Sequence, residues 1–406
     1  MTIDHFFAAR VSRMKASEIR ELLKLLDQPD IISFAGGIPD PAMFPVQDFQ
    51  AALNECLSDG GHAQALQYAP SEGNVALREW IVTRMASLGV PCDIDNIIVT
   101  AGSQQALDYL GKLYLSPGDT ALLGWPTYLG ALGAFNAYEP RFDRLDSMDN
   151  RSAGDIAAAA QAAGGRLKFS YLSPDFANPT GVTLTQAQRI AILDQANALD
   201  IAVVEDAAYQ SLRFEGDDIP PIQALEVDRT GSIEACRTIY CGSFSKTLSP
   251  GLRVGWICAA KPVIQQVVLL KQAGDLQTAT LNQMAIAKVA QSGFDAHVAK
   301  ICAHYGARRD AMVSALETHM PEGVSWTRPE GGMFVWLTLP KGIDAAVLLE
   351  LALKSEKVAF VPGAAFYPDG SANNTLRLNF SSPDHIQIAE GISRLARSIN
   401  VMKTTQ

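Results

Sequence analysis

Apolar and polar residues alternate with two different periods along the chain, and the change of pattern divides it in two. From about residue 94 to residue 292, short apolar runs of strand length alternate regularly with helical segments. The runs at 97–100 and 201–206 are apolar on both faces, as is typical of central parallel strands. Beyond residue 292 a long helical segment precedes alternating strands. The pattern predicts a large α/β domain followed by a smaller α+β domain.

The same periodicities predict the individual elements. Helices are expected where apolar residues recur at intervals of three or four, and strands where short apolar runs lie between turn residues. The predicted helices cover residues 17–28, 75–87, 106–115, 156–163, 186–199, 262–292, 297–319, 345–356 and 384–400. The predicted strands cover residues 31–34, 97–100, 120–123, 169–172, 201–206, 238–241, 254–260, 331–337, 358–363 and 375–380. The resulting division is a first arm of residues 1–35 that joins the small domain, a large domain of residues 36–292, and a small domain of residues 293–406.

Composition excludes several classes of protein. Apolar residues make up 48% of the 406 residues and charged residues 19%, so the chain can bury a sizeable core. The formal net charge of −10 argues against nucleic acid as a general partner, because no basic face can dominate it. There is no apolar run of membrane-spanning length, and Asp4, His5 and Arg10 do not fit a secretory signal. We therefore expect a cytoplasmic protein that binds neither nucleic acid nor membrane.

The cysteines and histidines do not form a metal-binding pattern. None of the six cysteines has Cys-x-x-Cys spacing, and none of the six histidines has His-x-x-x-His spacing. We therefore expect reduced thiols and no bound metal.

The segment 241–256 carries the strongest chemical signal. Lys246 stands between small hydroxyl residues, seven residues before Arg253, and an apolar run follows. A lysine held among apolar neighbours can lose its proton and form an imine with an aldehyde. Ser243, Ser245 and Arg253 would supply hydrogen-bond donors for a phosphate beside it. The alternative is a surface turn with a solvated lysine. A Ser-x-x-Lys motif on its own would favour this alternative.

Other motifs are weak alone but agree with this chemistry. The turn 101–105 joins a strand to a helix and can present free N–H groups to a phosphate, although most such turns bind nothing. The strand at 201–206 ends in two acids, at the edge where α/β sheets bind ligands. Asn178 opens an Asn-Pro-Thr-Gly sequence that is most often only a turn.

Together these motifs resemble those of the class I/II aminotransferases, which are fold-type I pyridoxal-phosphate enzymes. The segment around Lys246 resembles their Schiff-base lysine segment, and 178–181 resembles their Asn-Pro-x-Gly element. Residues 34–39 resemble the Phe-x-Gly-Gly-x-Pro loop of the 2-aminoadipate/kynurenine aminotransferase group. The resemblance extends from Phe34 to Phe380. It implies a mostly parallel seven-stranded sheet between helices, plus a smaller α+β domain.

The resemblance also implies a set of cofactor contacts. Lys246 would bind the aldehyde of pyridoxal 5′-phosphate and later move the substrate proton, and Asp206 would pair with the ring nitrogen. The ring oxygen would take donors from Asn178 and Tyr209, and Tyr128 would stack on the ring. The phosphate would be held by Ser103, Gln104, Ser243, Ser245, Arg253 and Tyr68 of the partner subunit.

The substrate contacts follow from the same resemblance. Arg377 would bind the α-carboxylate together with Asn178, the backbone at Gly37 would approach the substrate, and Arg20 would pair with a distal carboxylate. The implied activity is ping-pong transamination with glutamate and 2-oxoglutarate as one pair, in a homodimer with shared sites. The second amino acid would be 2-aminoadipate, aromatic or aliphatic.

Three alternatives to this activity can be stated. A β- or γ-lyase on the same fold would use the same lysine and aspartate. A transcription factor with an aminotransferase-like domain would need a further DNA-binding domain, for which only about thirty residues precede Phe34. A non-catalytic scaffold would be free to lose Lys246, which is present.

Overall fold

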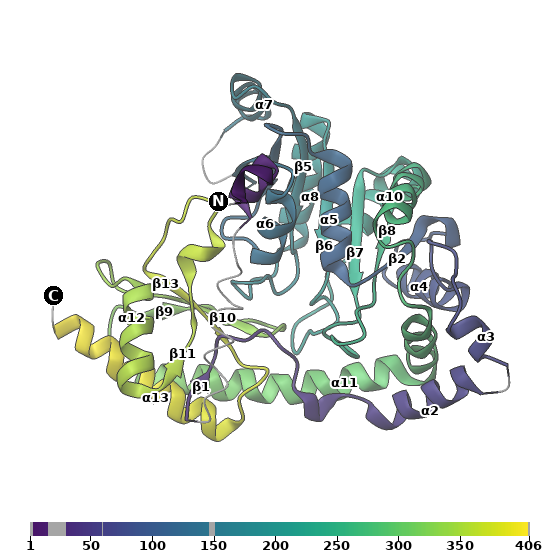
Figure 1. Cartoon of the computed structure of the whole chain (residues 1–406). Coiled ribbons are helices and arrows are strands. Elements are labelled where there is room, and N and C mark those ends of the chain that lie inside the picture. The colour runs from purple at the N-terminus through teal and green to yellow at the C-terminus, as the bar shows by residue number, and fades with distance from the viewer. Residues whose placement is uncertain (1–2, 15–29, 59, 146–150, 405–406) are drawn as a thin grey trace.

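The computed structural model of the chain describes residues 3–14, 30–58, 60–145 and 151–404 (Figure 1). The predicted helix at 17–28, with Arg20, lies outside these residues. Short 3₁₀ helices at Asp4–Phe6 and Ala9–Arg13 precede it. None of the helices in the described ranges is both long and apolar enough to cross a membrane.

The larger sheet has seven strands and is parallel except for one of them. Its strands, in spatial order, are β2 (Ile97–Thr100), β8 (Gly255–Cys258), β7 (Thr238–Ser243), β6 (Ala202–Asp206), β5 (Leu167–Leu172), β3 (Thr120–Leu123) and β4 (Arg141–Arg144). Strand β8 is antiparallel to both of its neighbours. The predicted mostly parallel seven-stranded sheet is confirmed.

Helices pack on both faces of this sheet, because its strands are apolar on both sides. The helices associated with it are α4 (Val75–Ser87), α5 (Ser103–Tyr114), α6 (Leu129–Asn136), α7 (Ala153–Ala162), α8 (Gln186–Leu199), α9 (Ile222–Thr230) and α10 (Lys261–Gly274). Successive residues of β6 point to opposite faces: Val204 packs in the cluster that includes α5 and α6, and Val203 in the cluster that includes α8 and α9. Glu205 and Asp206 continue this alternation.

The second region is built around a four-stranded antiparallel sheet. Its order is β12 (Val361–Pro362), β13 (Thr375–Asn379), β10 (Phe334–Thr338) and β9 (Ser325–Trp326). Strand β1 (Ile32–Ser33) pairs in parallel with β11 (Val358–Ala359). The remaining helices are α2 (Val46–Leu57), α3 (His62–Ala65), α11 (Thr280–His319), α12 (Ala345–Leu351) and α13 (His385–Thr404), with a π turn at Ala352–Glu356.

Helix α11 runs along the bottom of the view in Figure 1, beneath both regions. The sequence predicts two helices here, ending at residue 292 and starting at residue 297. Within α11 the structure has two helical segments that meet at a kink, where Gly293 has non-helical backbone angles, so the predicted break between two helices is confirmed. The proposed domain boundary falls at this kink, and the division into domains stays a prediction.

Two other differences from the predicted elements have local causes. Helix α5 starts at Ser103 rather than at Ala106, because Gly102 takes a φ of 79° and turns the chain directly from strand into helix. Strand β4 was not predicted, because its sequence Arg-Phe-Asp-Arg is mostly polar and the strand lies at the edge of the sheet.

Candidate active site

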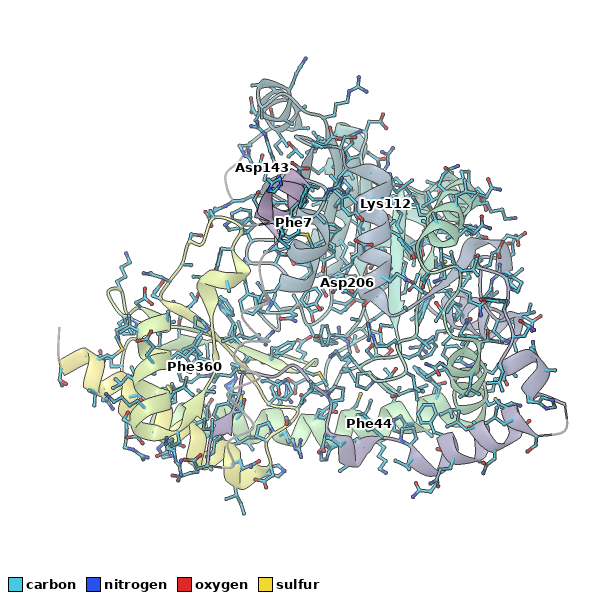
Figure 2. All side chains as sticks on the ribbon, viewed as in Figure 1. Phe7, Phe44, Lys112, Asp143, Asp206 and Phe360 are labelled. Atoms are coloured by element: carbon cyan, nitrogen blue, oxygen red, sulfur yellow. The ribbon has the colours of Figure 1, made fainter. Side chains whose placement is uncertain are left out.

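Most of the predicted site residues meet at one edge of the larger sheet. Strands β5, β6 and β7 are parallel, so their carboxyl ends lie at the same edge. Asp206 ends β6, Ser243 ends β7, and Asn178 follows β5. Figure 2 places Asp206 at the end of the sheet that faces β10 of the second region.

Lys246 has no acidic partner among the described residues. Its Nζ donates to the carbonyl oxygen of Gly37 at 2.8 Å and lies 5.9 Å from the centre of the Tyr209 ring. Burial, together with the positive charges of Arg377 and Arg253, lowers the pKa of Lys246 to about 8. A neutral, nucleophilic amine is therefore accessible near neutral pH.

Asp206 is buried, and one of its two oxygens lacks a partner. Its Oδ2 accepts a hydrogen bond from Tyr171 Oη at 2.8 Å, whereas Oδ1 has no hydrogen-bond partner among the described residues. Burial raises the pKa of Asp206 to about 6, although the bonds from Tyr171 and the Ala208 backbone oppose the shift. A buried oxygen left without a donor suggests that a ligand supplies one.

Arg253 and two serines border the start of α5. Arg253 Nη1 donates to Ser245 Oγ at 3.3 Å, and Nη2 donates to the carbonyl oxygen of Ala101 at 3.2 Å. Ser243 Oγ accepts from the Ser245 backbone N–H at 3.1 Å. A Cβ atom on Gly102 would collide with the Arg253 guanidinium, so glycine is required there. The backbone of Arg253 itself takes a φ of 54°, a strained conformation that is common at functional sites.

Ser103 and Gln104 lie beside this group, at the first turn of α5. Free N–H groups at a helix start attract anions. The Gln104 side chain donates to the carbonyl oxygen of Gly130 at 2.7 Å, and Tyr128 Oη lies 3.5 Å from Gln104 Oε1. The helix start, both serines and Arg253 together form a cup of the chemistry that a phosphate requires.

Arg377 is 1% exposed and has no carboxylate partner among the described residues. Its Nη1 donates to Asn178 Oδ1 at 2.7 Å and its Nη2 to the carbonyl oxygen of Ala35 at 2.8 Å. The guanidinium lies between the rings of Phe334 and Phe366, 4.3 and 5.1 Å from their centres. Burial lowers the pKa of Arg377 to about 10. A buried, unpaired guanidinium favours binding of a carboxylate.

Tyr209 is buried beside Asn178, which makes both available to one ligand atom. Burial raises the pKa of Tyr209, and a hydrogen bond with the Asn178 side chain opposes that shift. Tyr128 and Asn178 also line a cavity of about 460 Å³ that extends from Trp125 to helix α8.

Two of the predicted residues are not brought to this edge within the described chain. Tyr68 is 79% exposed on a surface loop, and Arg20 lies outside the described residues. No cluster of three potential metal ligands occurs in the ranges that the structure describes.

The structure adds four residues that sequence reasoning missed. Tyr171 orients Asp206, the rings of Phe334 and Phe366 enclose Arg377, and Gly102 admits Arg253. The strand register that puts Tyr171 beside β6 cannot be read from the sequence. The glycine in a strand-to-helix turn was the only available signal for Gly102.

The residues at this edge fit pyridoxal phosphate. A protonated ring nitrogen would supply the donor that Asp206 Oδ1 lacks, and Lys246 would supply the amine for the aldehyde. Asn178 and Tyr209 can face the ring oxygen, and the cup at the start of α5 can hold the phosphate.

Comparison with known proteins gives consistent similarities. The family model of aminotransferase class I and II matches residues 29–395. An aromatic-amino-acid aminotransferase of Thermococcus litoralis is 43% identical, over 98% of this chain and 95% of that protein. The crystal structure of a Pyrococcus horikoshii kynurenine aminotransferase in complex with PMP is 41% identical, with a TM-score of 0.90 and 98% of both chains covered.

A third similar protein is an α-aminoadipate aminotransferase of Thermus thermophilus. Its crystal structure contains N-(5′-phosphopyridoxyl)-L-leucine. It is 37% identical to this chain, with a TM-score of 0.89, and the match covers 100% of both chains.

Proposed function

The chain belongs to the class I and II aminotransferases. We propose that glutamate and 2-oxoglutarate are one of its two substrate pairs, and that the amino group is exchanged with a second amino acid and its 2-oxo acid. That second amino acid would be 2-aminoadipate or an aromatic or aliphatic amino acid. The chain is an aminotransferase with pyridoxal phosphate as its cofactor. The relatives' names support the range, because they include aromatic, kynurenine and α-aminoadipate aminotransferases. The β- or γ-lyase alternative has no support from these similarities.

The cofactor, when bound, supplies an aldehyde and a ring that accepts negative charge from the substrate. Lys246 would hold the aldehyde, and its amine would accept the proton from the substrate Cα and return it to the cofactor side. Asp206 keeps the ring nitrogen protonated. Arg377 binds the α-carboxylate, with Asn178 beside it. The observation that carries this proposal is that Asp206 Oδ1 lacks a hydrogen-bond partner, and Lys246 at the same edge lacks an acidic partner, among the described residues.

A substrate panel tests the reaction. The purified enzyme would be assayed with single amino acids against 2-oxoglutarate and pyruvate, following formation of the new amino acid. We expect transfer to 2-oxoglutarate and the parallel double-reciprocal plots of a ping-pong mechanism. Release of ammonia without any 2-oxo acid acceptor would instead favour the lyase.

The role proposed for Arg20 rests on the resemblance alone. Arg20→Ala should cost about 1.5–3 kcal/mol of transition-state stabilisation with dicarboxylic substrates, because a charge-assisted bond is lost. Leucine and phenylalanine should be little affected. Equal losses of kcat/KM for acidic and neutral substrates would show that Arg20 only holds its helix in place.

We also propose a homodimer with shared sites. Gln277 binds the backbone of Ala69 and Gln67, and this holds Tyr68 outward on the surface loop between them. Leu66 and Leu276 of the joined segments are 71% and 45% exposed, so the loop presents an apolar surface. Sedimentation at assay concentration tests the dimer, and an active monomer would contradict it.

A further inference from the structure

A fully buried lysine lies close to the phosphate cup, and the mechanism above does not use it. Lys271, in the last turn of α10, has no exposed side-chain surface, whereas its partner Asp275 is 31% exposed. Lys271 Nζ donates to both oxygens of Asp275, at 2.9 and 3.0 Å. Burial lowers the pKa of Lys271, and the Asp275 carboxylate opposes the shift.

This ion pair is joined to the cup through one amide side chain. Gln105 Oε1 accepts from Lys271 Nζ at 3.0 Å and from the Ala101 backbone N–H at 2.8 Å. Gln105 Nε2 donates to Asp275 Oδ2 at 2.7 Å. Because a cation faces the amide oxygen and an anion faces the amide nitrogen, only one orientation of Gln105 satisfies the network.

The fixed amide in turn fixes the turn that starts α5. The Ala101 N–H is held by Gln105, and the Ala101 carbonyl oxygen accepts from Arg253 Nη2. Ser103 and Gln104, which border the phosphate cup, follow Ala101 by two and three residues. Tyr109 Oη donates to Asp275 Oδ1 at 3.0 Å, and a Cβ atom on Gly274 would lie only 2.6 Å from that hydroxyl.

A buried ion pair is weak support for stability, because well-packed apolar residues often replace one at no cost. Here, however, the ion pair has a specific effect on geometry, because it fixes the orientation of the Gln105 side chain. We propose that Lys271 and Asp275 are positioning residues that hold the turn Ala101–Gln105 in the conformation that binds the cofactor phosphate. This proposal rests on the proposed function, since it assigns the cup at the start of α5 to the phosphate of pyridoxal phosphate.

The test compares two ligands that differ only in the phosphate. Equilibrium dialysis would measure the affinity of wild-type and Lys271→Met protein for pyridoxal phosphate and for pyridoxal. We expect Lys271→Met to weaken binding of pyridoxal phosphate about tenfold, because one charge-assisted network is lost, and to change pyridoxal binding less than about twofold. A purely structural role would lower the melting temperature without this difference between the ligands.

Two further variants keep the test decisive. Asp275→Asn preserves the shape at a partly exposed position, and it should show the same selective loss if Lys271→Met does not fold. Lys288→Met removes another lysine–carboxylate pair, to Glu55, and should leave both affinities unchanged. In a folded variant, an equal loss of affinity for both ligands, or no loss of affinity for either, would overturn the proposal. Failure of the wild type to prefer pyridoxal phosphate over pyridoxal would instead overturn the assignment of the cup itself.

Discussion

The two faces of strand β6 end in neighbouring acids with opposite surroundings. On the α9 side, Glu205 accepts from the backbone N–H groups of Ile222 and Gln223 at 2.8 and 3.0 Å, so both of its oxygens have donors. On the other side, Asp206 has a donor for only one oxygen. Both are buried, and burial raises the pKa of Glu205 to about 7 and that of Asp206 to about 6. Perturbed pKa values therefore do not separate the two, whereas the missing partner does.

The same contrast distinguishes the half-buried Lys246 from the buried Lys271. Lys271 is paired with Asp275, and Lys246 bonds only to the backbone of Gly37 among the described residues. In both comparisons the residue with complete partners has a structural role, whereas the one with a partner missing is available to a ligand. Each prediction below tests one side of this contrast.

The largest effect is expected at Lys246. Lys246→Ala should reduce kcat for transamination by at least about 10⁴-fold, because one side chain acts both as nucleophile and as acid–base group. Steady-state assays with glutamate as donor measure this, and Lys288→Met, which should keep wild-type turnover, is the control variant. Near-normal turnover of Lys246→Ala would end the assignment.

The next largest effect is expected at Asp206. Asp206→Ala should lower kcat by about 10²–10³-fold, because the charge that keeps the ring nitrogen protonated is lost. Cofactor content should fall much less, since the phosphate cup and Lys246 remain. An unchanged kcat in a variant that retains the cofactor would show that Asp206 does not keep the ring nitrogen protonated.

A smaller, pH-dependent effect follows from the pKa of Lys246. Only the neutral amine reacts with an aldehyde, and with a pKa of about 8 its fraction rises from roughly one tenth at pH 7 to roughly nine tenths at pH 9. The rate at which cofactor-free protein takes up pyridoxal phosphate should therefore increase up to about tenfold over this interval and then level off. A rate still climbing steeply above pH 10 would indicate an ordinary, solvated lysine.

The smallest effect on catalysis is expected at Glu205. Glu205→Gln should lower the free energy of unfolding by about 1–3 kcal/mol, because an amide cannot accept from both backbone N–H groups as the carboxylate does. Its kcat should stay within about threefold of the wild type. Chemical denaturation and the transamination assay give the two values, and a kcat loss as large as that of Asp206→Ala would erase the contrast between the faces of β6.

The sequence predicts the elements with strong periodicity but not their pairing. The helix at 186–199 and the strand at 97–100 have the predicted bounds, because a capped amphipathic helix and an apolar run are local signals. The antiparallel direction of β8 depends on contacts between distant segments.

The candidate site divides in the same way. Lys246, Asp206, Asn178 and Arg377 could be named because their motifs carry the chemistry. The sequence cannot show which of Asp206 and Glu205 lacks a hydrogen-bond donor, because the donors come from other elements. Those to Glu205 come from α9, and the donor to Asp206 comes from β5. The ion pair beside Gln105 likewise joins α10 to α5 and has no local signature.

The central claim is that Lys246, and not the buried Lys271, binds the cofactor. The most direct measurement is borohydride reduction of the enzyme loaded with pyridoxal phosphate, followed by peptide mapping by mass spectrometry. The account predicts a phosphopyridoxyl group on the peptide that contains Lys246 and none on the peptide that contains Lys271. Labelling of Lys271, or of exposed lysines with Lys246 unmodified, would contradict it.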